Sequence, residues 1–240
     1  MPVAVIQGAS RGLGLEFVRQ LRATHEVVAT CRKPDGAEAL RSLGVETVQL
    51  DVTDEASVAR AAETVGGRHP AVHLLLNVSG LLHDANGLGP EKRLADVEPE
   101  AMARVFAVNA YGPLLVAKHF HRLLTRHRQR AVLANLSARV GSIEDNRLGG
   151  WYAYRGSKAA QNLFTRNVAI ELGRASEEII VMALHPGTVE TDLSAPFRRN
   201  ARVVFPVDQA ARQLLDVIGG ATRETHHGGF FAWDGRPIPW

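Results

Sequence analysis

Short apolar strands alternate with amphipathic helices along this 240-residue chain, and the alternation limits the possible folds more than any other feature. Units of this kind connect parallel strands through right-handed crossovers, with helices on both faces of the sheet. We therefore predict an α/β protein: one doubly wound domain over residues 1–240 with a parallel sheet of about seven strands. The strands are expected at Val3–Ile6, Glu26–Cys31, Gly44–Leu50, Val72–Leu76, Ala131–Ser137, Glu178–Leu184 and Gly229–Ala232.

The helices are predicted from apolar residues three and four positions apart. We expect helices over residues 54–68, 98–127 and 207–218, and another that carries Tyr154 and Lys158. The second should bend at Gly112-Pro113. Leu81–Val97 is expected to be a loop, and the irregular segment Leu193–Pro206 is a candidate lid.

Composition narrows the class of function. A formal net charge of +3 without a long Lys or Arg run does not indicate nucleic-acid binding. No apolar stretch approaches the ~20 residues that a membrane span needs, and the N-terminus does not resemble a signal peptide. The single cysteine, Cys31, fits a reducing compartment. We expect a cytoplasmic protein that acts on a small molecule, without nucleic acid, membrane or metal.

A glycine-rich loop follows the first strand and leads directly into a helix. Its pattern is Gly8-x-x-x-Gly12-x-Gly14. Without a Cβ, Gly8 can make the tight turn, while Gly12 and Gly14 allow backbone and helix to approach a pyrophosphate. The helix N-terminus offers free N–H groups to the same anion. The segment therefore predicts a dinucleotide site.

The residues after the second strand indicate which dinucleotide binds. An acidic residue here would bind a ribose 2′-hydroxyl, but none lies between Val27 and Lys33. Arg32 ends the strand, and Arg11 lies in the glycine loop. Two guanidinium groups suit a 2′-phosphate, which favours NADP (NADPH) as the cofactor.

Tyr154 and Lys158 are four residues apart, so a helix places them on one face. A free tyrosine titrates near ~10, and a neighbouring ammonium group favours the phenolate and lowers that pKa. A tyrosine tuned in this way can donate or accept a proton near neutral pH. The pair is the predicted acid–base centre.

In their order along the chain, these motifs resemble the short-chain dehydrogenase/reductase family, in its C-factor and Sniffer-like carbonyl reductase branch. The resemblance implies a Rossmann-type domain and NADPH-dependent reduction of a carbonyl, or the reverse oxidation of an alcohol, in a homodimer or homotetramer. The family motifs are Gly8-x-x-x-Gly12-x-Gly14, Asp51, Asn77-x-x-Gly80, Asn109, Tyr154-x-x-x-Lys158 and Pro186-Gly187, and the branch motifs are Ala29–Arg32, Arg139–Ile143 and Phe230–Trp240.

The resemblance also implies a role for each matching residue. Tyr154 would protonate the substrate, Lys158 would lower the pKa of Tyr154 and hold the nicotinamide ribose, and Asn109 would anchor a relay water. Gly8, Arg11, Gly12 and Gly14 would hold the phosphates, Arg32 the 2′-phosphate, Asp51 and Val52 the adenine, Asn77 and Gly80 the adenosine ribose side, and Val189 and Thr191 the carboxamide. Ser10, Pro186 and Gly187 would also bind the cofactor.

One position departs from the family pattern. The slot before Arg139-Val-Gly, where the family has its catalytic serine, holds Ala138. Ser137 is a candidate substitute, although neighbours in a strand point to opposite faces, and Ser142 is another. Loss of one donor to the reacting oxygen costs ~3–4 kcal/mol. This leaves two functions open: a carbonyl reductase, or a cofactor-binding regulatory or signalling protein with little turnover.

Two helices look apolar on more than one face, which suggests an interface between subunits. The residues concerned are Leu114, Leu115, Val116 and Phe120 in one helix and Leu163, Phe164, Val168 and Ile170 in the other.

Overall fold

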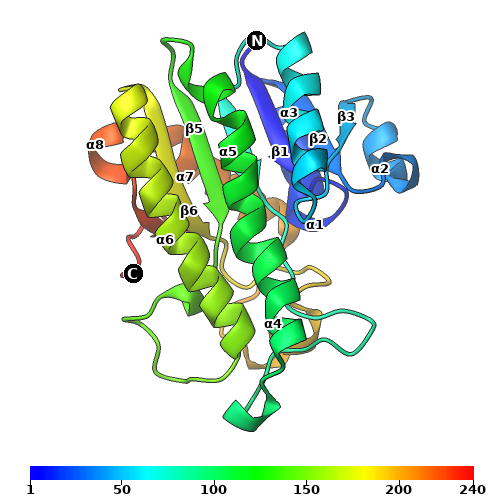
Figure 1. Cartoon of the computed structure of the whole chain (residues 1–240), viewed down its shortest axis with the longest axis vertical. Coiled ribbons are helices and arrows are strands. Elements are labelled where there is room, and N and C mark those ends of the chain that lie inside the picture. Colours follow the sequence, from blue (N-terminus) through cyan, green and yellow to red (C-terminus); the bar gives the residue numbers. More distant parts are fainter.

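The computed structural model describes residues 1–240, the side chain of Asn200 excepted. Its seven strands pair in parallel in the order β3-β2-β1-β4-β5-β6-β7 (Figure 1), so the predicted α/β domain with a seven-stranded parallel sheet is confirmed. The strands are β1 Val3–Gln7, β2 Glu26–Cys31, β3 Glu46–Gln49, β4 Leu74–Asn77, β5 Ala131–Leu136, β6 Ile179–His185 and β7 Phe230–Ala232.

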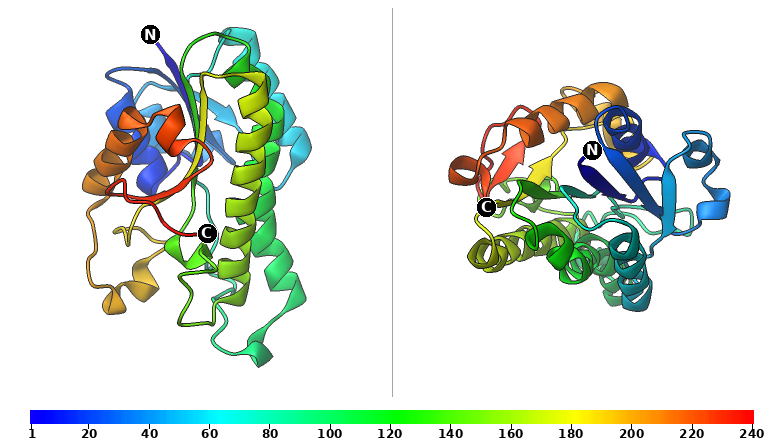
Figure 2. Two further views of the ribbon diagram at one scale, coloured as in Figure 1. Left: turned by 90° about the vertical axis from the view of Figure 1, so that its left-hand side faces the viewer. Right: turned by 90° about the horizontal axis from the view of Figure 1, so that it is seen from above.

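Helices cover both faces of the sheet (Figure 2). On one face Phe17 of α1 and Leu214 of α7 belong to the same buried cluster as Ile6 of β1. On the other, Val58 of α3 and Phe120 of α5 belong to a second cluster. The helices are α1 Gly12–Leu21, α2 Glu38–Arg41, α3 Glu55–Arg68, α4 Pro99–Phe106, α5 Gly112–Thr125, α6 Tyr152–Ala175, α7 Val207–Gly220 and α8 Arg223–His226.

Some boundaries differ from the sequence prediction. The third strand is shorter than Gly44–Leu50, and α2 and α8, at four residues each, were not predicted. A single turn is too short to display a helical period. The Leu81–Val97 loop contains a short 3₁₀ turn, Leu94–Asp96, and the candidate lid contains another, Ala195–Asn200. No helix among the described residues is long and apolar enough to cross a membrane.

The long helix expected over residues 98–127 is interrupted. α4 and α5 are joined by a π-helical segment, Ala107–Tyr111, which lies directly before the predicted bend at Gly112-Pro113. A Cβ on Gly112 would lie 2.7 Å from Cβ of Val52, so only glycine permits this close approach. Pro113 is the second residue of α5, which follows the π-helical segment directly, so its missing N–H removes a donor to the preceding turn.

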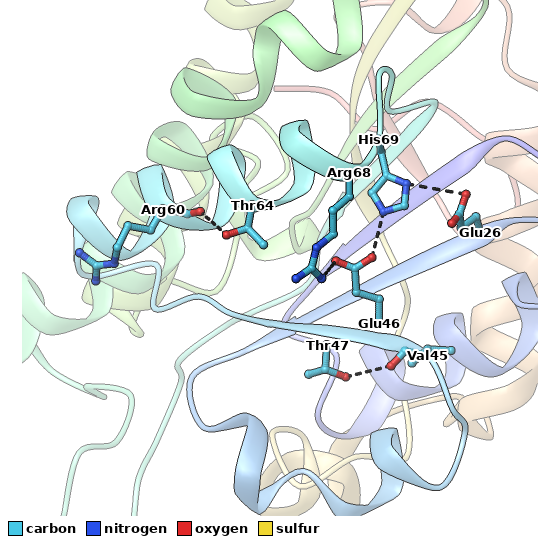
Figure 3. Close-up of polar contacts among 8 residues, drawn as sticks. All are labelled: Glu26, Val45, Glu46, Thr47, Arg60, Thr64, Arg68 and His69. Atoms are coloured by element: carbon cyan, nitrogen blue, oxygen red, sulfur yellow. Dashed lines mark hydrogen bonds and ion pairs between the residues drawn. The ribbon is translucent and has the colours of Figure 1, made fainter.

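A charged cluster fixes the end of α3 to the edge of the sheet (Figure 3). Buried His69 lies 2.9 Å from a carboxylate oxygen of Glu46 in β3 and 3.7 Å from one of Glu26 in β2. Arg68 forms an ion pair with Glu46 at 2.6 Å. The cluster therefore ties α3 to β2, the strand that precedes Arg32.

Because every strand is parallel, all carboxyl ends meet at one edge, towards the bottom of Figure 1. The strand order reverses direction between β1 and β4. In open α/β sheets, ligands bind in the crevice at this switch point. The glycine loop after β1 and the Asn77–Gly80 turn after β4 lie there.

Candidate active site

The glycine loop has the backbone geometry of a phosphate cradle. Gly8 and Gly12 have φ values of +85° and +55°, which favour glycine. A Cβ on Gly14 would collide with the carbonyl oxygen of Gly8. α1 begins at Gly12 without a side-chain cap and without an acidic residue in its first turn. Its N–H groups are therefore suited to an anion.

Two exposed guanidinium groups lie near this cradle. Arg11 immediately precedes α1 and pairs with Asp192 at 3.4 Å, but both side chains are largely in solvent. Such a pair contributes little free energy, so an incoming phosphate can compete for Arg11. Arg32 is exposed directly after β2. The two residues predicted to bind a 2′-phosphate therefore flank the same edge of the sheet.

The residues predicted to bind adenosine have other contacts as well. Asp51 accepts hydrogen bonds from Thr53 N and Oγ1, at 2.9 and 2.7 Å. Asn77 is buried and donates to Asn135 Oδ1 at 2.7 Å, which joins β4 to β5. A Cβ on Gly80 would lie 3.7 Å from Asn109 Oδ1. Asn77 thus joins the carboxyl ends of β4 and β5. Its contact with a cofactor stays a prediction.

The segment after β6 folds back over the glycine loop. Gly187 has φ +76°, and a Cβ there would lie 2.8 Å from the ring of Phe205. Val189 forms a parallel bridge with Phe205, which anchors the far end of the candidate lid. Thr191 approaches the position of a Cβ on Gly12 to 3.4 Å. The segment predicted to bind the nicotinamide end of the cofactor therefore lies beside the phosphate cradle.

Tyr154 and Lys158 lie one turn apart near the start of α6, and both are buried. Lys158 Nζ donates to Leu136 O at 2.8 Å and to Gln161 Oε1 at 2.9 Å, and lies 6.0 Å from the centroid of the Tyr154 ring. Burial lowers the pKa of Lys158 to about 7 and raises the pKa of Tyr154 to about 12. The expected lowering of the tyrosine pKa is therefore not a property of the chain by itself, because burial of the Tyr154 side chain raises its pKa.

Asn109 connects the loop after β4 to α6. Its fully buried side chain accepts from Leu81 N at 2.7 Å and donates to Leu81 O at 2.8 Å and to Ser157 Oγ at 3.0 Å. Four residues on, Pro113 has no N–H, so the Asn109 carbonyl lacks the α-helical donor it would otherwise have. That oxygen is suited to a water.

Neither serine that was considered for the catalytic slot points towards Tyr154. Ser137 Oγ donates to Asn162 Oδ1 at 2.6 Å. Asn162 is two turns beyond Tyr154 on α6, about 12 Å along the axis. Ser142 Oγ donates to Trp240 O at 3.1 Å. Both hydroxyls are engaged elsewhere, and Ala138 supplies no donor.

Glu91 supports the site, but no feature of the sequence predicts it. This buried side chain accepts from Ala153 N with both carboxylate oxygens, at 3.3 and 3.2 Å, and so caps the helix that carries Tyr154. Its carbonyl accepts from Trp151 N at 2.5 Å. A contact across 62 residues leaves no local pattern from which it could be predicted.

Comparison with known proteins decides the family. Residues 2–202 match the model of the short chain dehydrogenase family. The protein belongs to this family. The NADPH-bound carbonyl reductase from chicken fatty liver has a TM-score of 0.89 at 30% identity, with 100% of this chain and 94% of that chain covered. Carbonyl reductase Sniffer of D. melanogaster has a TM-score of 0.86 at 25% identity, with 100% and 99% covered.

A third similar protein is not named as a reductase. The C-signal of Myxococcus xanthus is 38% identical over 165 residues, which cover 68% of this chain and 93% of that protein. The family resemblance predicted from the sequence, including its branch, is confirmed by these matches.

This short-chain dehydrogenase also has a cavity of about 260 Å³ beside the carboxyl ends of β6 and β7. His185 lines it, with Nδ1 buried and without a hydrogen-bond partner. Burial, assisted by the nearby charge of Arg139, lowers the pKa of His185 to about 4. The imidazole is therefore neutral at physiological pH.

Proposed function

We propose that this protein is an NADPH-dependent oxidoreductase that reduces a carbonyl group to an alcohol, or catalyses the reverse reaction, with Tyr154 as the proton donor. The observation that carries the proposal is the arrangement of α6, which buries Tyr154 and Lys158 together one turn apart. The likeness to an NADPH-bound carbonyl reductase supports it.

The residues present fit NADPH. The uncapped start of α1 and the crowded glycines provide amides for the pyrophosphate, and Arg11 and Arg32 provide guanidinium groups for a 2′-phosphate. When bound, NADPH would supply the hydride. Lys158, whose ammonium now binds Leu136 O and Gln161 Oε1, would hold the nicotinamide ribose only after exchanging one of these partners.

The proton comes from the chain itself. A pKa of about 12 keeps the Tyr154 hydroxyl protonated at neutral pH, ready to donate to the carbonyl oxygen of a substrate. A lysine whose pKa is about 7 can both take up and release a proton near neutral pH, so Lys158 can reprotonate the phenolate. A water on the Asn109 carbonyl would extend this relay towards solvent.

Ala138 makes the proposed enzyme slow. The family serine would donate to the reacting oxygen, and loss of one such donor lowers turnover by roughly a hundred- to a thousandfold. The proton donor itself is retained, so we propose reduced turnover and not its complete loss.

The test is NADPH oxidation over a panel of diketones, quinones and aldehydes, with wild type and Tyr154→Phe. The variant loses the proton but keeps the ring, so NADPH should bind with an unchanged Kd while kcat falls by ~10²–10⁴. Wild-type turnover by Tyr154→Phe on every substrate would show that Tyr154 is not the acid.

A second candidate is a cofactor-binding signalling protein with little turnover. Two observations favour it: alanine at the serine slot, and 38% identity to the C-signal protein. The same panel discriminates between the candidates. Tight NADPH binding without turnover of any substrate would support the signalling function over the reductase.

A further inference from the structure

Four aromatic side chains form a row that begins at the proposed acid. The ring of Trp151 lies edge-on to that of Tyr154, with centroids 6.1 Å apart and planes at 74°. Phe197 meets Trp151 at 4.9 Å and 62°, and His83 meets Phe197 at 5.9 Å and 65°. Edge-to-face contacts of this kind are favourable for aromatic rings.

The backbone of Trp151 is held in an unfavourable conformation. Its φ of +53° and ψ of +42° make it the one non-glycine residue with positive φ in the described chain. A bulky side chain rarely adopts this region, and such strain persists where surrounding contacts enforce it. Here Trp151 N donates to Glu91 O, and Trp151 O accepts from Arg155 N at 2.8 Å. These bonds fix the backbone from which the indole contacts Tyr154.

Phe197 contacts Trp151 from a segment more than 40 residues further along the chain. It belongs to the 3₁₀ turn Ala195–Asn200 in the candidate lid between Leu193 and Pro206. His83 contacts the lid through the ring of Phe197, and its Nε2 lies 3.2 Å from the carbonyl oxygen of Asp192, the residue directly before the lid. Phe197 thus brings an aromatic ring onto the face of the molecule at which a substrate must approach Tyr154.

We propose that Trp151 is a specificity-determining residue that selects neutral carbonyl compounds with a planar aromatic ring, which would take the place of the Phe197 ring. This inference rests on the proposed function. The substrate ring would make the edge-to-face contact with Trp151 that Phe197 makes now, which places the attached carbonyl towards Tyr154. The buried carboxylate of Glu91 at the same helix end disfavours a substrate with an acidic group.

Two vicinal diketones provide the matched test: 1-phenyl-1,2-propanedione and 2,3-hexanedione. Replacing Trp151 with glycine removes the ring and suits the left-handed backbone, so the variant should fold. Trp151→Gly should lower kcat/KM for the phenyl diketone roughly tenfold and change the aliphatic one less than about twofold. Trp151→Phe should keep most of the preference. Leu148→Ala, at a 90% exposed side chain three residues earlier, is the control and should change neither value.

The outcomes separate this inference from the proposed function. Equal losses on both diketones in Trp151→Gly, or an equal wild-type kcat/KM for the two, would overturn the role of Trp151 while the reductase function stands. If the wild type turns over neither diketone, calorimetric binding of the phenyl diketone to the protein with NADP⁺ decides. Binding that Trp151→Gly weakens roughly tenfold would support the aromatic site alone, and equal binding by both proteins would overturn it.

Discussion

Ser137 donates a hydrogen bond to Asn162 across 2.6 Å inside the protein, and this contact settles which way the serine faces. The next residue, Ala138, has an extended backbone (φ −147°, ψ 145°), so its side chain points to the opposite side. The catalytic slot of the family is therefore occupied by a methyl group, and the neighbouring hydroxyl serves to join β5 to α6.

Restoring the family residue should raise activity. Ala138→Ser places a donor where the reacting oxygen is expected, and we predict a kcat roughly a hundred- to a thousandfold higher on whichever substrate the panel identifies. NADPH oxidation followed by absorbance measures it. An unchanged kcat would mean that the slot before Arg139 does not face the reaction.

Ser137→Ala should affect stability and leave the chemistry unchanged. It leaves Asn162 Oδ1 unpaired in the interior, which costs about 1–3 kcal/mol of unfolding free energy in a urea titration. Its kcat should stay within about twofold of wild type, well short of the hundredfold loss that removal of a catalytic donor causes. A collapse of kcat in the folded variant would restore Ser137 as the catalytic serine.

The sequence predicts features that depend on neighbouring residues and misses those that depend on burial or distance. The glycine loop and the Tyr154–Lys158 pair are visible because each lies within a few residues. The contact between Glu91 and Ala153 joins residues 62 positions apart and has no local pattern. The pKa of Tyr154 was expected to fall because the sequence shows its cationic neighbour, but it rises because the fold buries the hydroxyl.

Arg32 should determine cofactor preference. Its exposed guanidinium follows β2, where an acidic residue would favour NADH. We expect NADPH to bind at least tenfold more tightly than NADH, about 1.4 kcal/mol, and Arg32→Asp to abolish or invert the preference. Fluorescence titration with both cofactors measures this. Equal Kd values for the wild type would contradict it.

Buried Lys158 should reduce stability in a pH-dependent way. Its pKa falls from 10.5 to about 7 on folding, so between these values the unfolded chain holds more protons, and the unfolding free energy rises with pH. Methionine does not titrate, so Lys158→Met lacks this contribution to the pH dependence of the unfolding free energy. We expect the variant to be more stable than wild type by about 1–4 kcal/mol at pH 7, with a smaller gain at pH 9.5, in urea unfolding. An equal change at both pH values would mean that the lysine is not desolvated.

His185 should make the protein sensitive to acid. Its pKa is lowered from 6.5 to about 4, so its contribution to stability is complete above about pH 6.5 and is lost as the pH falls towards 4. The loss amounts to at most about 3 kcal/mol. His185→Met removes the titrating group, so its melting temperature should fall less than that of wild type between pH 7 and pH 4.5. Parallel curves for the two proteins would contradict the assignment.

Assembly should depend on the outer face of α6. Of the residues expected at an interface, Val116 and Phe120 are buried in the core, whereas Leu163 and Ile170 are 59% and 45% exposed. Tyr111 lies beside Phe164, with ring centroids 6.5 Å apart, and extends the same apolar face. We expect light scattering at micromolar concentration to give two or four times the 26.0 kDa chain mass.

The variant Leu163→Glu/Ile170→Glu should be a folded monomer, because an interface would have to bury two new carboxylates without partners. Leu148→Glu places one such carboxylate on an exposed loop residue outside α6, and should keep the wild-type mass. A monomeric wild type, or an unchanged mass in the double variant, would show that α6 is not the contact between subunits.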